Sequence, residues 1–334
     1  MSSFLQLPAH NSARVAHTNI FNTLIVTLSL IICKYIKKVG KNQKCSIEDA
    51  LPRHFLLLSQ FSEQLLPRAN INFNPTTSIM AKQKINIGTT PADSFYGITV
   101  TEKGPYLIYG RPPLAMQYIM PNEMNESWFF QEGRHFSTED EPTALCRCGA
   151  SKRKPYCDGS HAKHRWNPRL TAPPEAIIDN VDITSGDEIT ITDNQKYCVF
   201  ARFCDAAGGV WNNAEASFDR QAAKLAVRAA SVCPSSRLMA WKNDADEPYE
   251  LHYEPSLGLI EDPVIGASGG LWVRGGIRIE RENGRGYEIR NRTVLCRCGQ
   301  SSNKPYCDGS HAAMRWRDEL EGTPEGETVP EKIY

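Results

Sequence analysis

Two stretches of the sequence carry the same set of side chains that could ligate a metal. Each holds three cysteines and one histidine at the spacing C-x-C-x8-C-x3-H: Cys146, Cys148, Cys157 and His161 in the first stretch, and Cys296, Cys298, Cys307 and His311 in the second. Thiolate and imidazole are soft or borderline ligands, which suits a soft-metal site. The residue types and their spacing therefore predict two metal centres with the same ligands.

The spacing of the first two cysteines bears on which metal is bound. Structural zinc sites usually place about two to four residues between the first two ligands, and here only one residue separates them. A C-x-C pair can instead present both thiolates to one iron of a cluster, while the third cysteine and the histidine hold a second iron. Gly159 and Gly309 would permit the tight turn before each histidine. The spacing favours iron–sulfur clusters, and structural zinc is the alternative.

The two stretches match along their whole length. CRCGASKRKPYCDGSH covers residues 146–161, CRCGQSSNKPYCDGSH covers 296–311, and a tryptophan follows each histidine five residues later. Both resemble the CDGSH-type iron–sulfur domain (mitoNEET-like), whose pattern is C-x-C-x2-[ST]-x3-P-x-C-D-G-[SAT]-H. The resemblance implies two 2Fe-2S clusters. In each, the C-x-C cysteines would hold an inner iron, and the third cysteine and the histidine an outer, more exposed one.

The histidine ligand changes the expected redox behaviour. A neutral imidazole in place of an anionic thiolate makes reduction easier, so the potential rises above that of an all-cysteine cluster. Protonated imidazole is no longer a ligand, which would link the cluster to pH and allow its release. Asp158 and Asp308 have two interpretations, as acceptors that orient the ligand loop or as simple turn residues beside glycine.

A third group of cysteines, Cys198, Cys204 and Cys233, lies between the two repeats. It resembles a divergent ferredoxin-like mono-cluster segment, in which the last cysteine is likewise followed by proline. Ordinary 4Fe-4S ferredoxins use four cysteines, and only three are available here. Two interpretations stay open: a third iron–sulfur cluster, or three buried thiols in a ferredoxin-like remnant.

Short elements are expected to position these ligands. Residues 104–110 and 269–275 are apolar runs between glycines, which predict strands at equivalent places in the two repeats, and residues 122–132 are expected to form an extra surface loop. Residues 187–192 alternate apolar and polar side chains, which predicts a half-buried strand. A helix is expected from Asp219, as its N-cap, to Ser231, with Pro234 beyond its end.

These elements predict an α+β fold in which two small β-rich CDGSH iron–sulfur modules flank a central ferredoxin-like segment. The expected parts are an N-terminal extension (1–79), a first CDGSH domain (80–175), a divergent ferredoxin-like segment (176–250), and a second CDGSH domain with an acidic tail (251–334). Family members with one motif dimerise to bring two motifs together. The repeat therefore predicts a monomer in which the two motifs pair within one chain.

The composition excludes several classes of function. The 334 residues include 38 Lys+Arg and 38 Asp+Glu, so no net charge attracts nucleic acid or an anionic membrane. No nucleophile–base pair or phosphate-binding loop is evident, so the chain is not expected to be an enzyme. The cysteines cluster instead of spreading through a short secreted chain, which indicates metal ligands in a reducing, cytoplasmic environment.

The N-terminal extension has three interpretations. Residues 18–33 carry no charge and are followed by lysines, but the stretch is short for a membrane span, which needs about 20 apolar residues. It is a weak membrane anchor, a packed helix, or part of an over-extended start upstream of Met80.

The sequence thus predicts an iron–sulfur protein that acts in one-electron transfer or redox sensing with redox partner proteins. A cluster donor to apo-proteins is the alternative. Its docking face would be the more basic first repeat, with Lys152, Arg153, Lys154, Lys163 and Arg165. A zinc-binding structural adaptor is a third hypothesis.

Overall fold

The structure, a computed structural model, describes residues 89–320. The predictions for residues 1–79 and for the acidic tail beyond residue 320 lie outside these described residues. Within 89–320, no helix is both long enough and apolar enough to cross a membrane.

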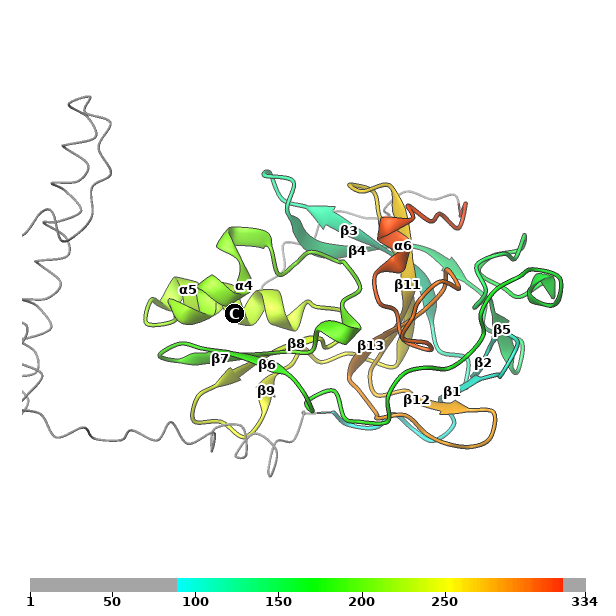
Figure 1. Cartoon of the computed structure of the whole chain (residues 1–334), viewed down its shortest axis with the longest axis horizontal. Helices are drawn as coiled ribbons and strands as arrows, with labels where there is room; N and C mark the ends of the chain where they lie inside the picture. The colour runs from blue at the N-terminus through cyan, green and yellow to red at the C-terminus, as the bar shows by residue number, and fades with distance from the viewer. Residues whose placement is uncertain (1–88, 321–334) are drawn as a thin grey trace, which may run out of the picture. The chain divides into compact units, whose positions relative to one another are not determined.

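Within the described residues the strands form three sheets, with few helices, which confirms the predicted α+β class (Figure 1). The first sheet has the order β12 (Arg278–Arg281), β1 (Gly97–Val100), β2 (Tyr106–Tyr109), β5 (Thr143–Leu145). The second has the order β13 (Arg292–Leu295), β11 (Ala267–Arg274), β10 (Ser256–Asp262), β3 (Leu114–Pro121), β4 (Ser127–Phe136). The third, in the middle segment, has the order β6 (Asp182–Ser185), β7 (Ile189–Asp193), β8 (Leu238–Lys242), β9 (Pro248–Tyr249).

The first two sheets each combine strands from both sides of the middle segment. In the first sheet β1 runs parallel to β12, with Gly97 opposite Arg278. In the second, β3 runs parallel to β10, with Leu114 opposite Leu257. Residues of the expected first and second CDGSH domains therefore share backbone hydrogen bonds, and the two repeats form one body.

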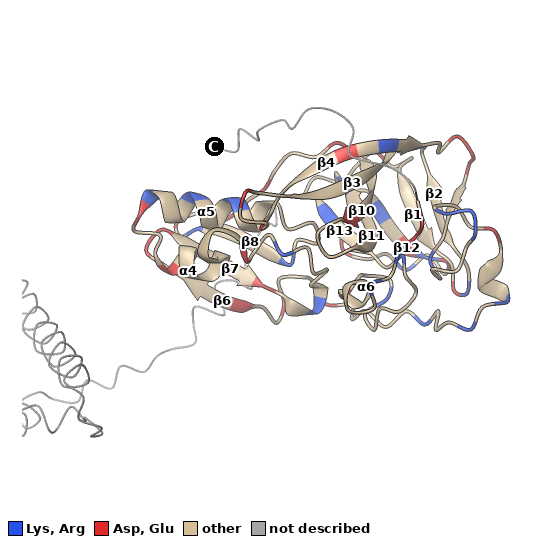
Figure 2. Cartoon of the chain, turned by 90° about the horizontal axis from the view of Figure 1, so that it is seen from above, with Lys and Arg blue, Asp and Glu red and all other residues tan. Residues whose placement is uncertain are grey.

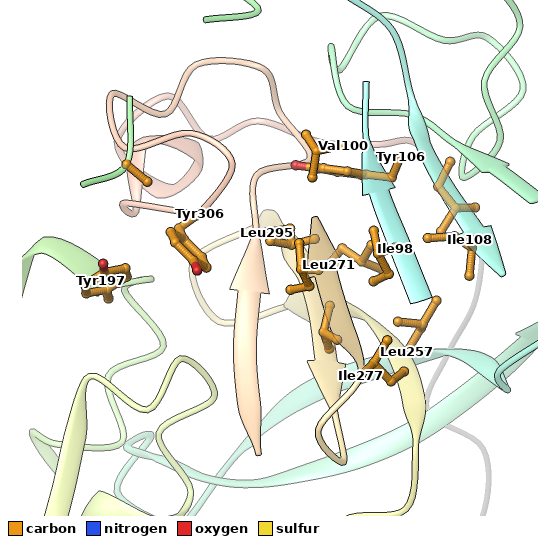
Figure 3. Close-up of a cluster of buried hydrophobic side chains, with 14 of the residues drawn as sticks. Ile98, Val100, Tyr106, Ile108, Tyr197, Leu257, Leu271, Ile277, Leu295 and Tyr306 are labelled. Atoms are coloured by element: carbon orange, nitrogen blue, oxygen red, sulfur yellow. The ribbon is translucent and has the colours of Figure 1, made fainter. Parts of the chain in front are cut away.

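The strands meet over a shared apolar core. Burial alternates along β1 and β2, as expected for strands with one face against a core. Figure 3 shows Ile98 of β1 near Leu271 of β11 and Leu295 of β13, so side chains from both repeats fill the same space. Tyr106 donates a hydrogen bond to the carbonyl of Cys296 at 2.7 Å, which links a first-repeat strand to a second-repeat ligand.

Two strand predictions are confirmed and one loop prediction is wrong. β2 and β11 lie where the glycine-bounded runs predict strands. The expected surface loop at 122–132 is restricted to a turn at residues 122–126, because β4 begins at Ser127. The Phe130 ring of β4 packs 4.4 Å from Trp272 and 4.9 Å from Phe203, measured between ring centroids, so its aromatic side chain belongs to the core.

The middle segment contains the predicted strand and helix, although the strand is mostly buried and not half-buried. The expected strand is β7, and the expected helix is α5 (Arg220–Ser231), whose N-cap Asp219 accepts hydrogen bonds from the backbone of Gln221 and Ala222. A second helix, α4 (Val210–Glu215), precedes α5. Both helices pack on the third sheet, which is visible on the left of Figure 1.

A buried arginine joins this segment to the second repeat. Arg292 of β13 is fully buried and forms an ion pair with Glu250 at 2.6 Å. It also donates to the carbonyl of Ala230 at 2.8 Å and to that of Cys233, at the end of α5. One side chain thus satisfies acceptors from three parts of the chain.

Replacement of this arginine is expected to be strongly destabilising. Arg292→Ala would leave Glu250 and several carbonyls buried without a partner, so the free energy of unfolding should fall by about 3–5 kcal/mol. Denaturant unfolding of the purified protein measures the loss. Arg285→Ala, at an exposed position, is the matched control and should change the stability by less than about 0.5 kcal/mol. Equal losses in both variants would contradict this role.

Candidate metal centres

Each ligand set is placed by a short backbone ladder at the end of a strand. In the first repeat β5 ends at Leu145, and the backbone N–H of Cys146 then donates to the carbonyl of Pro155 at 2.8 Å. Cys157 donates in the same way to Ala144 at 2.9 Å. The second repeat has the same two bonds, Cys296 to Pro305 and Cys307 to Val294, at 2.8 and 2.9 Å.

The side chains meet in pairs. The Sγ atoms of Cys146 and Cys148 lie 3.8 Å apart, and Cys157 Sγ lies 3.3 Å from His161 Nδ1. The corresponding distances in the second repeat are also 3.8 and 3.3 Å. Two thiolates on one tetrahedral metal, with bonds of about 2.3 Å, stand about 3.8 Å apart. Each pair is therefore spaced to share one metal ion.

The pairs do not merge into larger groups. Among residues 89–320, no three His, Cys, Asp or Glu side chains come close enough together to hold one metal ion. Each predicted set of four ligands is thus divided two by two. The C-x-C cysteines form one pair, and the third cysteine and the histidine form the other.

The aspartates organise the turn before each histidine. Asp158 accepts hydrogen bonds from the backbone N–H groups of Lys152 at 2.8 Å and Ser160 at 2.9 Å. Hydrogen bonds from Ser160 and Lys152 hold the pKa of Asp158 well below its usual range. Asp308 makes the same backbone contacts in the second repeat. The aspartates are therefore acceptors that hold the ligand loop, as the first interpretation predicts.

One thiol of each C-x-C pair is favoured as a thiolate. A hydrogen bond from the neighbouring thiol lowers the pKa of Cys146 to about 6 and that of Cys296 to about 7, while the same contact, together with burial, raises the pKa of Cys148 and Cys298. A thiolate, not a thiol, is the metal ligand. Burial lowers the pKa of His311 to about 4, and the positive charge of Arg297 acts in the same direction. His311 is therefore the neutral imidazole that a metal requires.

The arginine between the first two cysteines is a structural residue that ligand spacing does not reveal. Arg147 is 1% exposed and donates to four carbonyls, among them those of Gly104 at 3.0 Å and Thr101 at 2.7 Å. The guanidinium carbon lies 4.7 Å from the centroid of the Trp166 ring. Arg297 and Trp316 repeat this stack at 5.4 Å. The arginine and tryptophan recur at the same positions in both repeats, and this recurrence is the sequence signal that they hold the ligand loops in place.

The two ligand loops are in backbone contact through glycines. Gly149 and Gly299 both have φ +79°, a conformation that L side chains rarely adopt. A Cβ on Gly149 would lie 2.5 Å from the carbonyl oxygen of Cys298, and one on Gly299 would clash with the carbonyl of Cys148. Each loop therefore leaves room for the other only because glycine stands at this position.

Gly149→Ala is accordingly expected to remove metal from both centres, because its Cβ would push against a ligand residue of the other repeat. The metal content of the purified protein should fall by half or more. Gly284→Ala is the matched control, since Gly284 lies outside both ligand loops and has φ +80° but nothing within 4 Å of an added Cβ. It carries the same strain, about 1–2 kcal/mol, and should retain both metals. An intact metal content in Gly149→Ala would contradict this contact between the two ligand loops.

The three cysteines of the middle segment are also brought together. Cys198, Cys204 and Cys233 line one small pocket together with Pro234 and Arg237. Burial, helped by the nearby Asp205 and Cys233, raises the pKa of Cys204 to about 12. The pocket keeps both interpretations of these cysteines open.

Two family models match the parts of the chain that contain these cysteines and histidines. The model of the CDGSH-type iron-binding zinc finger matches residues 103–162 and 268–312. The model of the divergent 4Fe-4S mono-cluster family matches residues 184–243. No curated protein and no solved structure matches the chain. The predicted order of two CDGSH regions around a mono-cluster region is confirmed, and the chain carries iron–sulfur binding domains.

Proposed function

We propose that this chain, with CDGSH-type regions on both sides of a divergent 4Fe-4S mono-cluster region, holds two 2Fe-2S clusters and acts in one-electron transfer or redox sensing. Cys146, Cys148, Cys157 and His161 hold the first cluster, and Cys296, Cys298, Cys307 and His311 hold the second. The observation that carries the proposal is the division of each ligand set into two pairs.

The paired geometry bears on the choice between iron–sulfur and zinc. A single tetrahedral zinc ion needs all four ligands around one point. A two-iron cluster needs two ligands at each of two points. Pairs at 3.8 and 3.3 Å in both repeats match the second requirement. This geometry supports iron–sulfur over the zinc adaptor hypothesis.

The bound cluster would supply a one-electron couple whose potential is raised by the imidazole ligand. The chain's own residues orient the ligands. Arg147 and Arg297 anchor the C-x-C loops through carbonyls, and the aspartates fix the turn before each histidine. We assign no catalytic residue and do not regard the chain as an enzyme.

A third cluster in the middle segment is the second candidate cofactor. It is favoured by the pocket that Cys198, Cys204 and Cys233 share, and by the match of residues 184–243 to a 4Fe-4S family. We infer that the ligands of this third, 4Fe-4S-type cluster are these three cysteines.

Redox partner proteins are the expected partners, with apo-proteins that accept a cluster as the alternative. Parallel pairing of β1 with β12 and of β3 with β10 supports a monomer, because the two motifs find each other within one chain. We place the protein in the cytoplasm on its clustered cysteines.

Visible absorption of the purified protein tests the proposal. A red-brown solution that bleaches when dithionite delivers about one electron per cluster is the expected result. A colourless protein that contains zinc would overturn it.

A further inference from the structure

The two motifs are alike in their ligands but differ in what covers the outer pair. His161 and Cys157 are both half-buried, whereas His311 is 6% exposed and Cys307 is 3% exposed. Local sequence does not explain this difference, because the residues from the third cysteine to the histidine are identical in the two repeats. The difference lies in the neighbouring chain.

The middle segment covers the second motif. The carbonyl of Lys196 accepts a hydrogen bond from Asn303 at 2.9 Å, and the rings of Tyr197 and Tyr306 lie 5.1 Å apart in an edge-on arrangement. A Cβ on Gly309 would meet the carbonyl oxygen of Cys198 at 3.1 Å. Cys307 itself lies in a buried cluster that includes Val199, Ala201 and Phe203.

The equivalent surface of the first motif has no such cover among the described residues. A Cβ on Gly159 would meet nothing within 4 Å. In Figure 1 the segment that follows β5 lies at the end of the described fold away from α4 and α5, whereas α6 (Ser310–Ala313) of the second motif lies between them. The first motif therefore presents its outer ligand pair to the surroundings.

The two motifs also differ in the charge of the residues around their outer ligand pairs. Residues 152–169 contain six basic residues and one acid, whereas the corresponding residues 302–319 contain three basic and three acidic residues. Lys152, Arg153 and Lys163 are exposed, and Ser302, Asn303 and Ala313 replace them in the second motif. Figure 2 shows several blue segments on the loops at the end of the fold away from α4 and α5. The carboxylate of Asp158 is held by backbone N–H groups.

We propose that an acidic protein docks on the first motif, over Cys157, His161 and the basic rim formed by Lys152, Arg153 and Lys163. Residues 196–203 cover the second motif and keep such a partner away from it. This inference rests on the proposed function, because the docked partner would exchange electrons or iron with the cluster of the first motif. A cluster exchanges electrons or iron only with a group brought close to it. A basic rim around an accessible ligand pair favours an acidic partner by charge complementarity.

The accessibility of the two sites is tested by iron release from the loaded protein to a chelator. Release should have two phases of equal amplitude, the faster at least about tenfold quicker than the slower. Cys157→Ser should remove the fast phase, and Cys307→Ser the slow one. A single phase in a protein that holds two clusters would overturn the inference and leave the proposed function intact. Protein without clusters would overturn both.

Docking is tested with a strongly acidic plant-type apo-ferredoxin as the probe. The combined variant Lys152→Glu, Arg153→Glu, Lys163→Glu should weaken its binding at least tenfold at low salt, and added salt should reduce the difference. The matched control Arg220→Glu, Lys224→Glu, Arg285→Glu changes the same charge at exposed positions elsewhere and should alter binding by less than twofold. Cluster spectra should be unchanged in both variants. Equal affinities in the two variants, or tighter binding of RNA or anionic vesicles, would overturn the inference.

Discussion

Removal of iron from the loaded protein is expected to lower its melting temperature by at least about 20 °C. The candidate ligand cysteines of the second motif, Cys296, Cys298 and Cys307, are almost fully buried, so metal bonds to them would act inside the core. Structural metal sites contribute about 10 kcal/mol or more to folding. For a fold of this size each kcal/mol corresponds to about 2–4 °C. Thermal melts of the loaded and chelated protein measure the difference.

Both repeats should melt together, because β1 pairs with β12 and Tyr106 hydrogen-bonds to the backbone of Cys296. The double variant Cys157→Ser, Cys307→Ser is the matched control. It should melt near the temperature of the chelated protein and should not respond to the chelator. A chelated protein that melts within a few degrees of the loaded one, or in two separate transitions, would contradict this account.

His161→Cys and His311→Cys are each expected to retain a cluster and to lower the potential of that cluster by about 100 mV or more. A fourth thiolate adds negative charge to the site, which disfavours the reduced state. The altered site should also lose most of its acid lability, because no imidazole remains to be protonated. Potentiometric titration followed by absorption measures the shift for each site.

His164→Cys is the control for this pair of variants. His164 is exposed and lies three residues after His161, outside the ligand spacing. The substitution should leave both potentials unchanged. Unchanged potentials in both His161→Cys and His311→Cys would show that these histidines are not iron ligands.

The pairing of the candidate ligands and the loops that carry them could be predicted, because the signals for them are short-range. Cys146 to His161 spans a single loop, in which the aspartate and glycine act within a few residues of the ligands. The N-cap Asp219 and the apolar run of α5 are local for the same reason. Periodicity and spacing report such features directly.

The exchange of strands between repeats could not be predicted in this way. The pairing of β1 with β12 joins residues about 180 positions apart, such as Thr99 and Glu280. Short strands carry no local mark of their partner, so apolar alternation gives the buried face but not the neighbour. Only the first part of β4, residues 127–132, lies in the expected loop. Its strand could not be predicted, because the aromatic side chain of Phe130 packs against Trp272 and Phe203 of distant segments.

The difference between the two motifs also depends on long-range packing. Their ligand residues are identical, and the cover over the second motif comes from residues 196–203. Only the basic residues of the first repeat indicated an asymmetry. The buried role of Arg147 and Arg297 was hidden because an arginine in a short loop is ordinarily exposed.

Iron and acid-labile sulfide content per chain tests the central claim most directly. Two 2Fe-2S clusters predict about four iron atoms and about four sulfides per chain. A third cluster in the middle segment would raise the iron and sulfide contents above four, and Cys233→Ser would return both to about four. About two zinc ions per chain with no sulfide would contradict the account.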